Sequence, residues 1–298
     1  MTHFLSVEKS NREELLRLLE ETQQFKAMRG QSNSLLNGQT WALIFNKPST
    51  RTRVSFEVGL RELGANVIFL SQNELQLGRG EPIIDTARVL GRIVRGAVVR
   101  TFAQAELESF ASYGGIPTIN ALTDEEHPCQ IVADLFTILE QRGTIDDLKV
   151  CFVGDGDCNV ARSWIWAAEY LGFELRVAAP KKYQPAEVLK KRIKSAKISF
   201  TSDVKAASAG ANVLYTDVWV SMGKETESDG RLADLAEFQI NEELVKLAAT
   251  QALVMHCLPA YRGREITESV LEANATTIFT QAENRLHAQK AIIAAVSR

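Results

Sequence analysis

The chain has 298 residues, of which 45% are hydrophobic and 24% are charged, and its formal net charge is -3. Because domains commonly hold about 100–200 residues, this length predicts two domains, each with enough apolar residues for its own core. The negative net charge argues against a generic nucleic-acid-binding protein, which usually carries a clear excess of basic residues. We therefore expect an ordinary globular protein in which any bound anion is held by local groups.

The first 25 residues carry scattered charges and no apolar run long enough for a signal peptide or a membrane span. We expect a cytoplasmic protein with no membrane contact. The four cysteines (Cys129, Cys151, Cys158 and Cys257) are too few and too irregularly spaced for a disulfide scaffold or a zinc ribbon, so free thiols are predicted. The four histidines form no HExxH pattern, and we expect neither a metal nor a cofactor.

Apolar segments of strand character alternate along the chain with segments of helical periodicity, after an amphipathic helix at the start. Four strands are predicted in the first half, at residues 41–45, 66–70, 97–102 and 116–122. Five more are predicted in the second half, at residues 149–154, 174–179, 198–202, 212–217 and 252–259. This alternation predicts the α/β class, with two doubly wound parallel-sheet lobes, and two such lobes imply a cleft.

Three further segments connect or follow the predicted strands. Residues 127–143 have apolar residues at helical spacing and end in glycine, which predicts a helix joining the lobes. Residues 281–296 form a second amphipathic helix. Residues 221–239 are polar and longer than most connections, and they directly follow the strand at 212–217. This segment is either a binding loop, since ligands bind at the carboxyl ends of strands, or a solvated insertion.

The residues Ser49, Thr50, Arg51, Thr52 and Arg53 follow the strand at 41–45 and begin a predicted helix. Free backbone N–H groups and the positive end of the helix dipole bind anions at such a position, and here hydroxyl and guanidinium groups join them. The segment does not match the P-loop pattern GxxxxGK[ST], which disfavours nucleoside triphosphates. A smaller phosphate compound is the predicted ligand.

Other polar residues also lie at strand ends and helix starts. Arg100 lies near the end of the strand at 97–102, where it could provide a second arginine for the same anion. His127 opens the joining helix, and the positive end of the helix dipole favours its neutral form. Cys257 ends the strand of the second lobe and is either a nucleophile, a ligand or a packing residue. Arg285, in the last helix, either reaches an anion or has no such role.

Five short motifs together resemble the aspartate/ornithine carbamoyltransferase family, and within it the members that use ornithine. They are STRTR (49–53), HPCQ (127–130), DVWVSMG (217–223), HCLP (256–259) and ENR (283–285), and they stand in the family's order along nearly the whole chain. The resemblance implies a carbamoyl-phosphate-binding domain at residues 1–130, completed by the C-terminal helix 283–298, and an ornithine-binding domain at residues 131–282. It also implies a homotrimer, or a multiple of trimers, with shared active sites.

The resemblance implies a role for each candidate residue. Carbamoyl phosphate would be bound by Ser49, Thr50, Arg51, Thr52, Gln76, Arg100, His127, Gln130, Cys257, Leu258 and Arg285, with Gln76 supplied by a neighbouring subunit. Ornithine would be bound by Asn159, Asp217, Ser221 and Met222. The catalytic groups would be Arg100, His127, Asp217 and Cys257. Where the family usually has GDG and two asparagines, this chain has GDGDCN at 154–159, which is one residue longer.

The implied reaction is transfer of the carbamoyl group of carbamoyl phosphate to the side-chain amine of L-ornithine, which yields L-citrulline and phosphate for arginine biosynthesis. HCLP and DVWVSMG favour ornithine over aspartate, and N-acylornithine and putrescine remain alternative acceptors. A nucleotide-dependent oxidoreductase is a further alternative, because residues 152–161 form a strand, a glycine-containing turn and a helix start. That segment lacks the third glycine of GxGxxG. A non-catalytic binding protein on the same scaffold is the last alternative.

Overall fold

The computed structural model describes residues 1–31, 33–71, 80–220 and 225–298, and these divide into two compact units. Unit 1 comprises Met1–Phe136 and Glu283–Arg298, and unit 2 comprises Thr137–Ala282. Two helices, α5 (Pro128–Arg142) and α12 (Ala275–Ser297), cross the boundary between the units. The joining helix predicted at 127–143 is therefore α5, and the last predicted helix is the greater part of α12.

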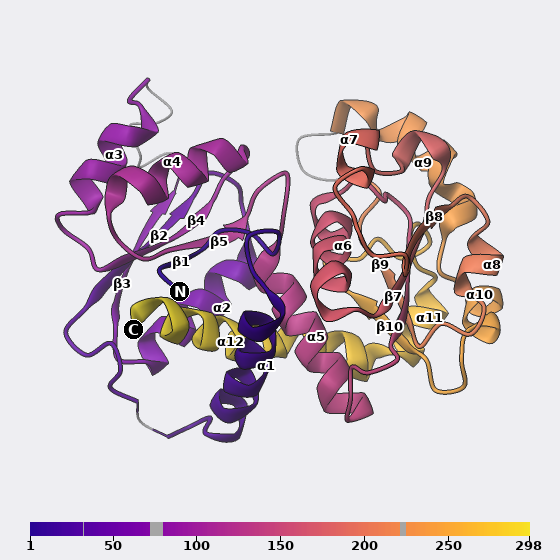
Figure 1. Cartoon of the computed structure of the whole chain (residues 1–298), viewed down its shortest axis with the longest axis horizontal. Helices are drawn as coiled ribbons and strands as arrows, with labels where there is room; N and C mark the ends of the chain where they lie inside the picture. The colour runs from indigo at the N-terminus through magenta and orange to yellow at the C-terminus, as the bar shows by residue number, and fades with distance from the viewer. Residues whose placement is uncertain (32, 72–79, 221–224) are drawn as a thin grey trace. The chain divides into compact units, whose positions relative to one another are not determined.

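Unit 1 is built on a parallel five-stranded sheet in the order β1-β5-β4-β2-β3. Its strands are β1 (His3–Phe4), β2 (Thr40–Phe45), β3 (Asn66–Ser71), β4 (Gly96–Arg100) and β5 (Thr118–Leu122). Its own helices are α1 (Arg12–Ala27), α2 (Thr50–Glu62), α3 (Ile83–Leu90) and α4 (Gln104–Gly114). Figure 1 shows α3 and α4 on one face of this sheet and α1, α2 and α12 on the other.

Both faces of the unit 1 sheet are covered, which explains why its central strands are almost wholly apolar. Ala42 and Ile44 of β2 pack in one buried cluster with Leu107 and Phe110 of α4. Trp41 and Leu43 alternate with them and are also fully buried. Since successive side chains of a strand point to opposite faces, β2 contributes to the core on both sides of the sheet.

Unit 2 is built on a second parallel five-stranded sheet, in the order β10-β9-β6-β7-β8. Its strands are β6 (Lys149–Val153), β7 (Glu174–Ala178), β8 (Ile198–Thr201), β9 (Val213–Thr216) and β10 (Leu253–His256). Its larger helices are α6 (Asn159–Leu171), α8 (Val204–Ser208), α9 (Ser228–Leu235), α10 (Glu242–Leu247) and α11 (Glu268–Ala273). Its shorter helices are η2 (Lys181–Tyr183), α7 (Glu187–Lys190), η3 (Glu225–Glu227) and η4 (Ala236–Phe238).

Aromatic contacts hold α6 against the unit 2 sheet. Trp164 of α6 meets Tyr215 of β9 edge-on, with ring centroids 5.3 Å apart, and Tyr215 stacks on Phe152 of β6 at 5.7 Å. All three side chains are fully buried. Such pairs contribute about 0.5–1.5 kcal/mol each beyond the burial of their surface. They fix α6, and with it the residues at its N-terminus, relative to the carboxyl ends of β6 and β9.

The structure confirms the predicted α/β class with two parallel sheets, and each of the nine predicted strands is present with ends shifted by a few residues at most. Two details were wrong. A short strand, β1, precedes the opening helix, because two residues suffice to pair with the edge of β5. The segment 221–239 is also not a continuous loop, since residues 225–238 form η3, α9 and η4.

The parallel topology brings the ends of neighbouring strands together within each unit. In unit 1 the adjacent strands β2 and β4 end at Phe45 and Arg100, which are register partners. In unit 2 the adjacent strands β10, β9 and β6 end at His256, Thr216 and Val153. These two edges carry most of the predicted site residues that the structure describes. Across the described ranges, no helix is long and apolar enough to cross a membrane.

Candidate active site

The N-terminus of α2 in unit 1 is the candidate anion-binding position. Ser49 is the N-cap residue, with extended backbone, and its side chain makes no capping hydrogen bond. The first turn of α2 contains no acidic residue. The Nε atom of Arg51 is buried and has no hydrogen-bond partner among the residues that the structure describes. Backbone N–H groups, the Ser49 hydroxyl and this guanidinium are therefore available for a phosphate.

Arg53, in the same turn, already has partners. Its guanidinium carbon lies 3.6 Å from the centre of the Phe69 ring, and its Nε lies 3.8 Å from a carboxylate oxygen of Glu57. Thr50 is exposed, whereas Thr52 is buried and accepts a hydrogen bond from Nη2 of Arg285. Of these two arginines, only Arg51 has a buried N–H donor that remains unpaired within the described residues, so Arg51 is the better candidate for binding a phosphate.

Arg100 and His127 lie close to each other and to Arg285. Arg100 is buried at the end of β4, where the pairing with β5 shifts register between Val99 and Arg100. His127 is buried immediately before α5, and burial lowers its pKa well below the usual value, with the positive charges of Arg285 and Arg100 acting in the same direction. The imidazole is therefore neutral, as predicted, although burial is the main cause rather than the helix dipole.

Gln130 offers an acceptor in the same part of unit 1. Its Nε2 donates a hydrogen bond of 2.8 Å to Asp134, which fixes the amide because a carboxylate can only accept. Its Oε1 is buried and has no partner within the described part of the chain. A carbamoyl group has an NH₂ that needs such an acceptor. Unit 1 thus brings together Thr52, Arg100, His127 and Arg285, with Gln130 one turn further along α5.

A lysine beside the anion-binding turn was missed at the sequence level. Lys47 is buried, forms an ion pair with Asp124, and has its Nζ 4.2 Å from the centre of the Phe102 ring. It stands two residues before Ser49, so it adds positive charge near the start of α2. A basic residue between the strand and the helix could have been noted, but its burial follows from tertiary packing alone.

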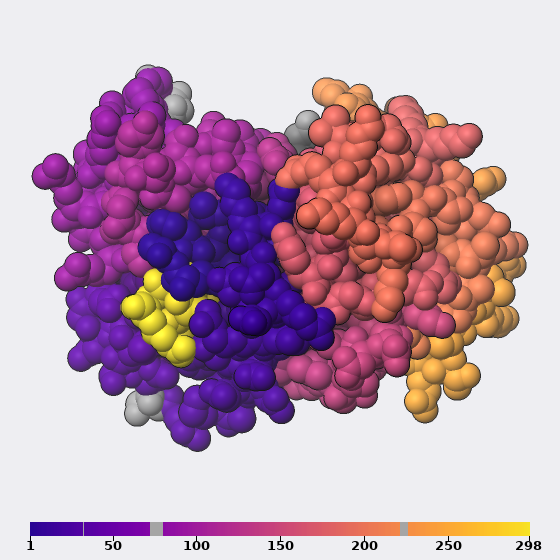
Figure 2. Space-filling view, in the orientation of Figure 1, coloured from indigo at the N-terminus to yellow at the C-terminus, as the bar shows by residue number. Residues whose placement is uncertain are grey.

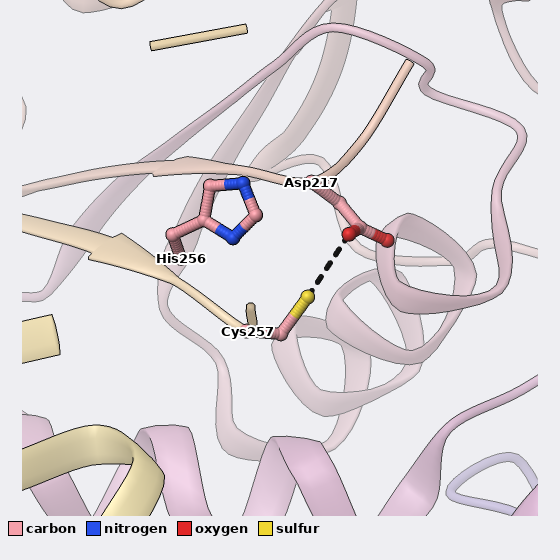
Figure 3. Close-up of side chains that lie close together, drawn as sticks. All are labelled: Asp217, His256 and Cys257. Atoms are coloured by element: carbon pink, nitrogen blue, oxygen red, sulfur yellow. Dashed lines mark hydrogen bonds between the residues drawn. The ribbon is translucent and has the colours of Figure 1, made fainter. Parts of the chain in front are cut away.

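In unit 2, Asp217 and Cys257 follow the adjacent strands β9 and β10 and meet at the edge of the sheet (Figure 3). The Sγ of Cys257 donates to Oδ1 of Asp217 at 3.0 Å, and the Val218 N–H donates to the same oxygen at 2.7 Å. Burial raises the pKa of Asp217, while His256 and these two hydrogen bonds oppose the rise. Both donors use Oδ1, and within the described ranges no hydrogen bond is made to the second oxygen of Asp217, which can accept from a cationic ligand.

The two ring nitrogens of His256 are both used within the protein. Nδ1 accepts the N–H of Leu258 at 2.9 Å, so the proton belongs to Nε2, which faces Oε1 of Glu265 at 3.2 Å. His256 and Glu265 are fully buried, and the same Glu265 oxygen accepts the N–H of Tyr261. Leu258 has a left-handed backbone (φ 59), and the bond from its N–H to His256 supports this conformation.

Asp217, His256 and Cys257 form the one group in the described ranges whose ligand atoms, all within 4.8 Å, could hold a metal ion. A metal would require a lone pair on the imidazole, yet Nδ1 accepts a hydrogen bond and Nε2 carries the proton. The Cys257 thiol is also engaged as a donor. The donor set therefore fits a hydrogen-bonded cluster better than a metal site.

Asn159 is the first residue of α6, and its neighbour Cys158 is the N-cap residue, whose Sγ accepts the Ala161 N–H. Cys158 lies close enough to Asp217 for that carboxylate to raise the pKa of its thiol, although burial is the larger cause. The lengthened turn is stabilised by Asp157, which pairs with Arg162 at 3.0 Å. The other predicted site residues, Gln76, Ser221 and Met222, lie outside the described residues.

A second missed residue, Arg231, ties together the loops around Asp217. Its Nε donates to the Trp219 carbonyl at 2.7 Å, and its guanidinium forms a buried ion pair with Asp155 and lies 4.7 Å from the centre of the Tyr183 ring. Such a buried pair leaves an uncompensated charge when one partner is removed, at a cost of about 3–5 kcal/mol. The sequence did not indicate these contacts, because Arg231 stands in the polar segment 221–239, where an arginine is usually exposed to solvent.

Comparison with known proteins identifies the family. Residues 2–140 match the carbamoyl-P binding domain of aspartate/ornithine carbamoyltransferases, and residues 146–296 match the Asp/Orn binding domain. The chain belongs to the aspartate/ornithine carbamoyltransferase family. The anion-binding turn, Arg100 and His127 all fall in the first of these domains, and Asp217 and Cys257 fall in the second.

Similar proteins within that family are ornithine carbamoyltransferases. The chain is 55% identical to the ornithine carbamoyltransferase of Akkermansia muciniphila over 300 residues, covering 100% of this chain and 98% of that protein. It resembles the crystal structure of the anabolic ornithine carbamoyltransferase of Campylobacter jejuni with a TM-score of 0.94 and 40% identity, covering 99% of both chains. The ornithine carbamoyltransferase of Pyrococcus furiosus gives a TM-score of 0.92 at 44% identity, covering 98% of this chain and 96% of that one.

Proposed function

We propose that this protein is an ornithine carbamoyltransferase, which transfers the carbamoyl group of carbamoyl phosphate to the side-chain amine of L-ornithine. The observation that carries the proposal is the pairing of two kinds of site in one chain. Unit 1 has an open helix N-terminus with a buried, unpartnered arginine donor, and unit 2 has a buried carboxylate held by Cys257. The first suits a phosphate, and the second suits an ammonium group.

Carbamoyl phosphate would bind with its phosphate at the start of α2, next to Ser49, Thr50, Arg51 and Thr52. Arg100, His127 and Thr52 would donate hydrogen bonds to the carbonyl oxygen, which gains negative charge as the amine attacks. Neutral His127 can donate through one ring N–H without becoming charged. Donors placed in advance around a developing oxyanion contribute several kcal/mol, with about 3–4 kcal/mol lost when one is removed.

The acceptor must lose a proton before it can attack. If the ornithine side-chain amine titrates near ~10.4, as lysine does, only about one molecule in a thousand is uncharged at neutral pH. Asp217 would hold the α-ammonium, with Asn159, Ser221 and Met222 at the α-carboxylate, and Cys257 would steer the amine. Leu258 would contact the carbamoyl group. The tetrahedral intermediate then expels phosphate and leaves citrulline, and no covalent bond to the enzyme forms.

A homotrimer is part of the proposal, and apolar residues on unit 1 support an assembly of copies. Val54 and Val58 of α2 are 54% and 37% exposed, and Ile68 of the edge strand β3 is 43% exposed. Val54 and Val58 share one helix, whereas Ile68, the register partner of Ala42, lies on the sheet face that packs with α4 rather than α2. Gln76 would be supplied from a neighbouring copy. The cytoplasmic location and the role in arginine biosynthesis also remain predictions.

An acceptor comparison tests the proposal. The protein is incubated with carbamoyl phosphate and, in separate reactions, with ornithine, N-acetylornithine, putrescine or aspartate, and the carbamoylated product and phosphate are measured. Ornithine should give a kcat/KM well above that of the other three acceptors. Preference for N-acetylornithine or putrescine would overturn the assignment of ornithine as the acceptor. The absence of product with all four acceptors would overturn the proposed carbamoyltransferase function. The oxidoreductase alternative has no support from the family to which the chain belongs.

A further inference from the structure

The carboxylate of Glu126 binds the N-terminal segment of the chain to the turn that precedes His127. Glu126 is buried, its Oε2 accepts the Val7 N–H at 2.8 Å, and its Oε1 accepts the Glu8 N–H at 3.2 Å. More than a hundred residues separate these partners in sequence. One side chain therefore satisfies two successive backbone donors that would otherwise be left without acceptors.

The backbone of Glu126 closes the same turn. The Thr123 N–H donates to the Glu126 carbonyl at 2.9 Å, and the Glu126 N–H donates to the Thr123 hydroxyl at 3.2 Å. His127 follows directly, and Pro128 begins α5. Proline has a fixed φ and is favoured at the first helical position, so Pro128 leaves little backbone freedom after His127. The orientation of His127 is therefore set mainly by the turn that precedes it.

Buried polar side chains extend this link towards β1. The Thr123 hydroxyl donates to Oε1 of Gln104 at 2.8 Å, and Nε2 of Gln104 donates to the Leu5 carbonyl at 3.2 Å. Asn120 donates to the same carbonyl at 2.8 Å. The segment from Leu5 to Glu8 is thus held by three residues that surround the turn, and Figure 2 shows the N-terminal part of the chain at the surface of unit 1, beside the C-terminal helix.

The turn also has a direct bond towards the anion-binding position. Asp124, at its second residue, pairs with Lys47, which lies two residues before Ser49. The N–H of Asp124 donates to the Phe102 carbonyl at 2.8 Å, close to the end of β4. The turn 123–126 is therefore bonded to Lys47, which precedes the start of α2, and to Phe102, which follows β4.

We propose that Glu126 is a positioning residue for the carbamoyl-phosphate side of the reaction, and that the N-terminal segment acts through it to hold His127 against the carbonyl oxygen. This inference rests on the proposed function. Glu126 is assigned no contact with substrate, because it is buried and its carboxylate binds the backbone of Val7 and Glu8. Loss of Glu126 should weaken the hydrogen bond from His127 to the carbonyl oxygen. It should leave phosphate binding at the start of α2 unchanged.

The test compares Glu126→Ala and Glu126→Gln with the wild type in the full chain. Glu126→Ala should lower kcat/KM for carbamoyl phosphate by at least 10-fold, with the KM for ornithine changed less than 2-fold. Inorganic phosphate, used as a competitor of carbamoyl phosphate, should keep its inhibition constant within 2-fold, since it does not need His127. Glu126→Gln retains one acceptor oxygen, so its loss should be intermediate.

Glu21→Ala is the matched control, because Glu21 is also a buried carboxylate of unit 1 and pairs with Arg298 at 2.7 Å. It should lower the melting temperature as Glu126→Ala does and leave both kinetic constants unchanged. An inhibition constant for phosphate that rises together with the loss in kcat/KM would overturn the inference, as would unchanged kcat/KM. A wild type that makes no citrulline would instead overturn the proposed function.

Discussion

At the scale of single residues, the two arginines of the first turn of α2 have different surroundings, which favour a ligand-binding role for Arg51 and a structural role for Arg53. Arg51 has a buried Nε without a partner in the described part of the chain, while Arg53 stacks on Phe69 and approaches Glu57. A buried donor without an acceptor is costly unless a ligand supplies one. Their neighbouring positions in sequence make them a natural pair for mutation.

Arg51→Ala should abolish most of the activity without unfolding the protein. We expect kcat/KM for carbamoyl phosphate to fall by about 10²–10³-fold, as when a donor to a developing charge is removed. The free energy of unfolding should change by no more than about 0.5 kcal/mol, because no protein hydrogen bond of its Nε is lost. Steady-state kinetics and urea denaturation measure the two quantities. Arg53→Ala is the control and should retain activity within 3-fold; equal losses in both variants would contradict the assignment of Arg51.

Asp217 is a residue at which binding and stability should oppose each other. Burial raises the pKa of Asp217 in the folded protein above the ordinary carboxyl value. Below that ordinary value the carboxyl is protonated in both the folded and the unfolded state. As the pH rises from there through the raised pKa, the folded protein loses stability, because it must give up a proton that it binds more tightly than the unfolded chain does. Asp217→Asn keeps an oxygen that can accept from Cys257 and Val218 but carries no buried charge. Its stability relative to the wild type should therefore increase between pH 3 and pH 7, as measured by denaturation at several pH values.

The same Asp217→Asn variant should lose acceptor binding, with kcat/KM for ornithine reduced by about 10–100-fold through loss of a charged hydrogen bond. A variant that is less stable than the wild type at pH 7, or one that binds ornithine normally, would show that the carboxylate has a structural role only.

At the scale of secondary-structure elements, close packing of α3 and α4 is made possible by two facing glycines. A Cβ on Gly91, just after α3, would lie 1.9 Å from the carbonyl oxygen of Gly114, whereas a Cβ on Gly114 would have no neighbour closer than 3.5 Å. Both glycines lie on the face of the unit 1 sheet that is covered by α3 and α4. At this contact, the spacing between α3 and α4 therefore leaves room for a Cβ atom at position 114 but not at position 91.

Gly91→Ala should destabilise the protein by about 1–3 kcal/mol, or more if the helices cannot separate, since overpacking forces the backbone to shift. Gly114→Ala should be neutral or gain up to about 1 kcal/mol, because alanine is the better residue within a helix. Chemical denaturation of both variants gives the comparison. Similar stabilities would mean that α3 and α4 adjust freely, contrary to the geometry.

The elements also show what could be predicted from sequence and why the rest could not. The strands were found because both faces of each sheet are covered, which makes residues such as Trp41 to Ile44 a continuous apolar run. The helices at 225–238 were missed because the segment is mostly polar, and its buried residues include Arg231, whose partner Asp155 lies 76 residues away. Local periodicity contains no information on such long-range pairs.

The candidate site follows the same division. Ser49 to Thr52, Arg100, His127 and Cys257 were predicted because each stands at a strand end or a helix start, where parallel topology gathers ligand-binding groups, and Asp217 was predicted from the motif DVWVSMG. Lys47, Glu126 and Arg231 were missed, since their roles depend on burial and on partners distant in sequence. Motifs thus indicate candidate ligand-binding residues better than the buried residues that support them.

At the scale of the whole molecule, unit 1 combines the candidate phosphate site with an exposed apolar region on the same helix. Val54 and Val58 occupy α2, whose first turn carries Arg51. An assembly of copies through α2 would cover these side chains. The predicted homotrimer therefore links the oligomeric state to the element that begins with the anion-binding turn.

Val58→Glu should disrupt the assembly, because a charge would be buried without a partner. Sedimentation of the wild type should give the mass of a trimer or a multiple of it, and the variant should shift towards the monomer. Val188→Glu is the control, since Val188 is a 74% exposed valine of unit 2, and it should not change the mass. A wild type that sediments as a monomer would contradict the predicted assembly.

The most direct test of the central claim follows the carbamoyl carbon itself. The protein is mixed with ornithine and carbamoyl phosphate labelled with ¹³C at the carbonyl, and the label is followed by NMR while released phosphate is measured. After subtraction of the spontaneous breakdown of carbamoyl phosphate in buffer, we predict that the label passes into the ureido carbon of citrulline in a one-to-one ratio with phosphate. When ornithine is omitted, the label should leave carbamoyl phosphate no faster than in buffer alone. Phosphate release with the label recovered only as cyanate or bicarbonate would contradict the account, because the protein would then consume carbamoyl phosphate without transferring its carbamoyl group.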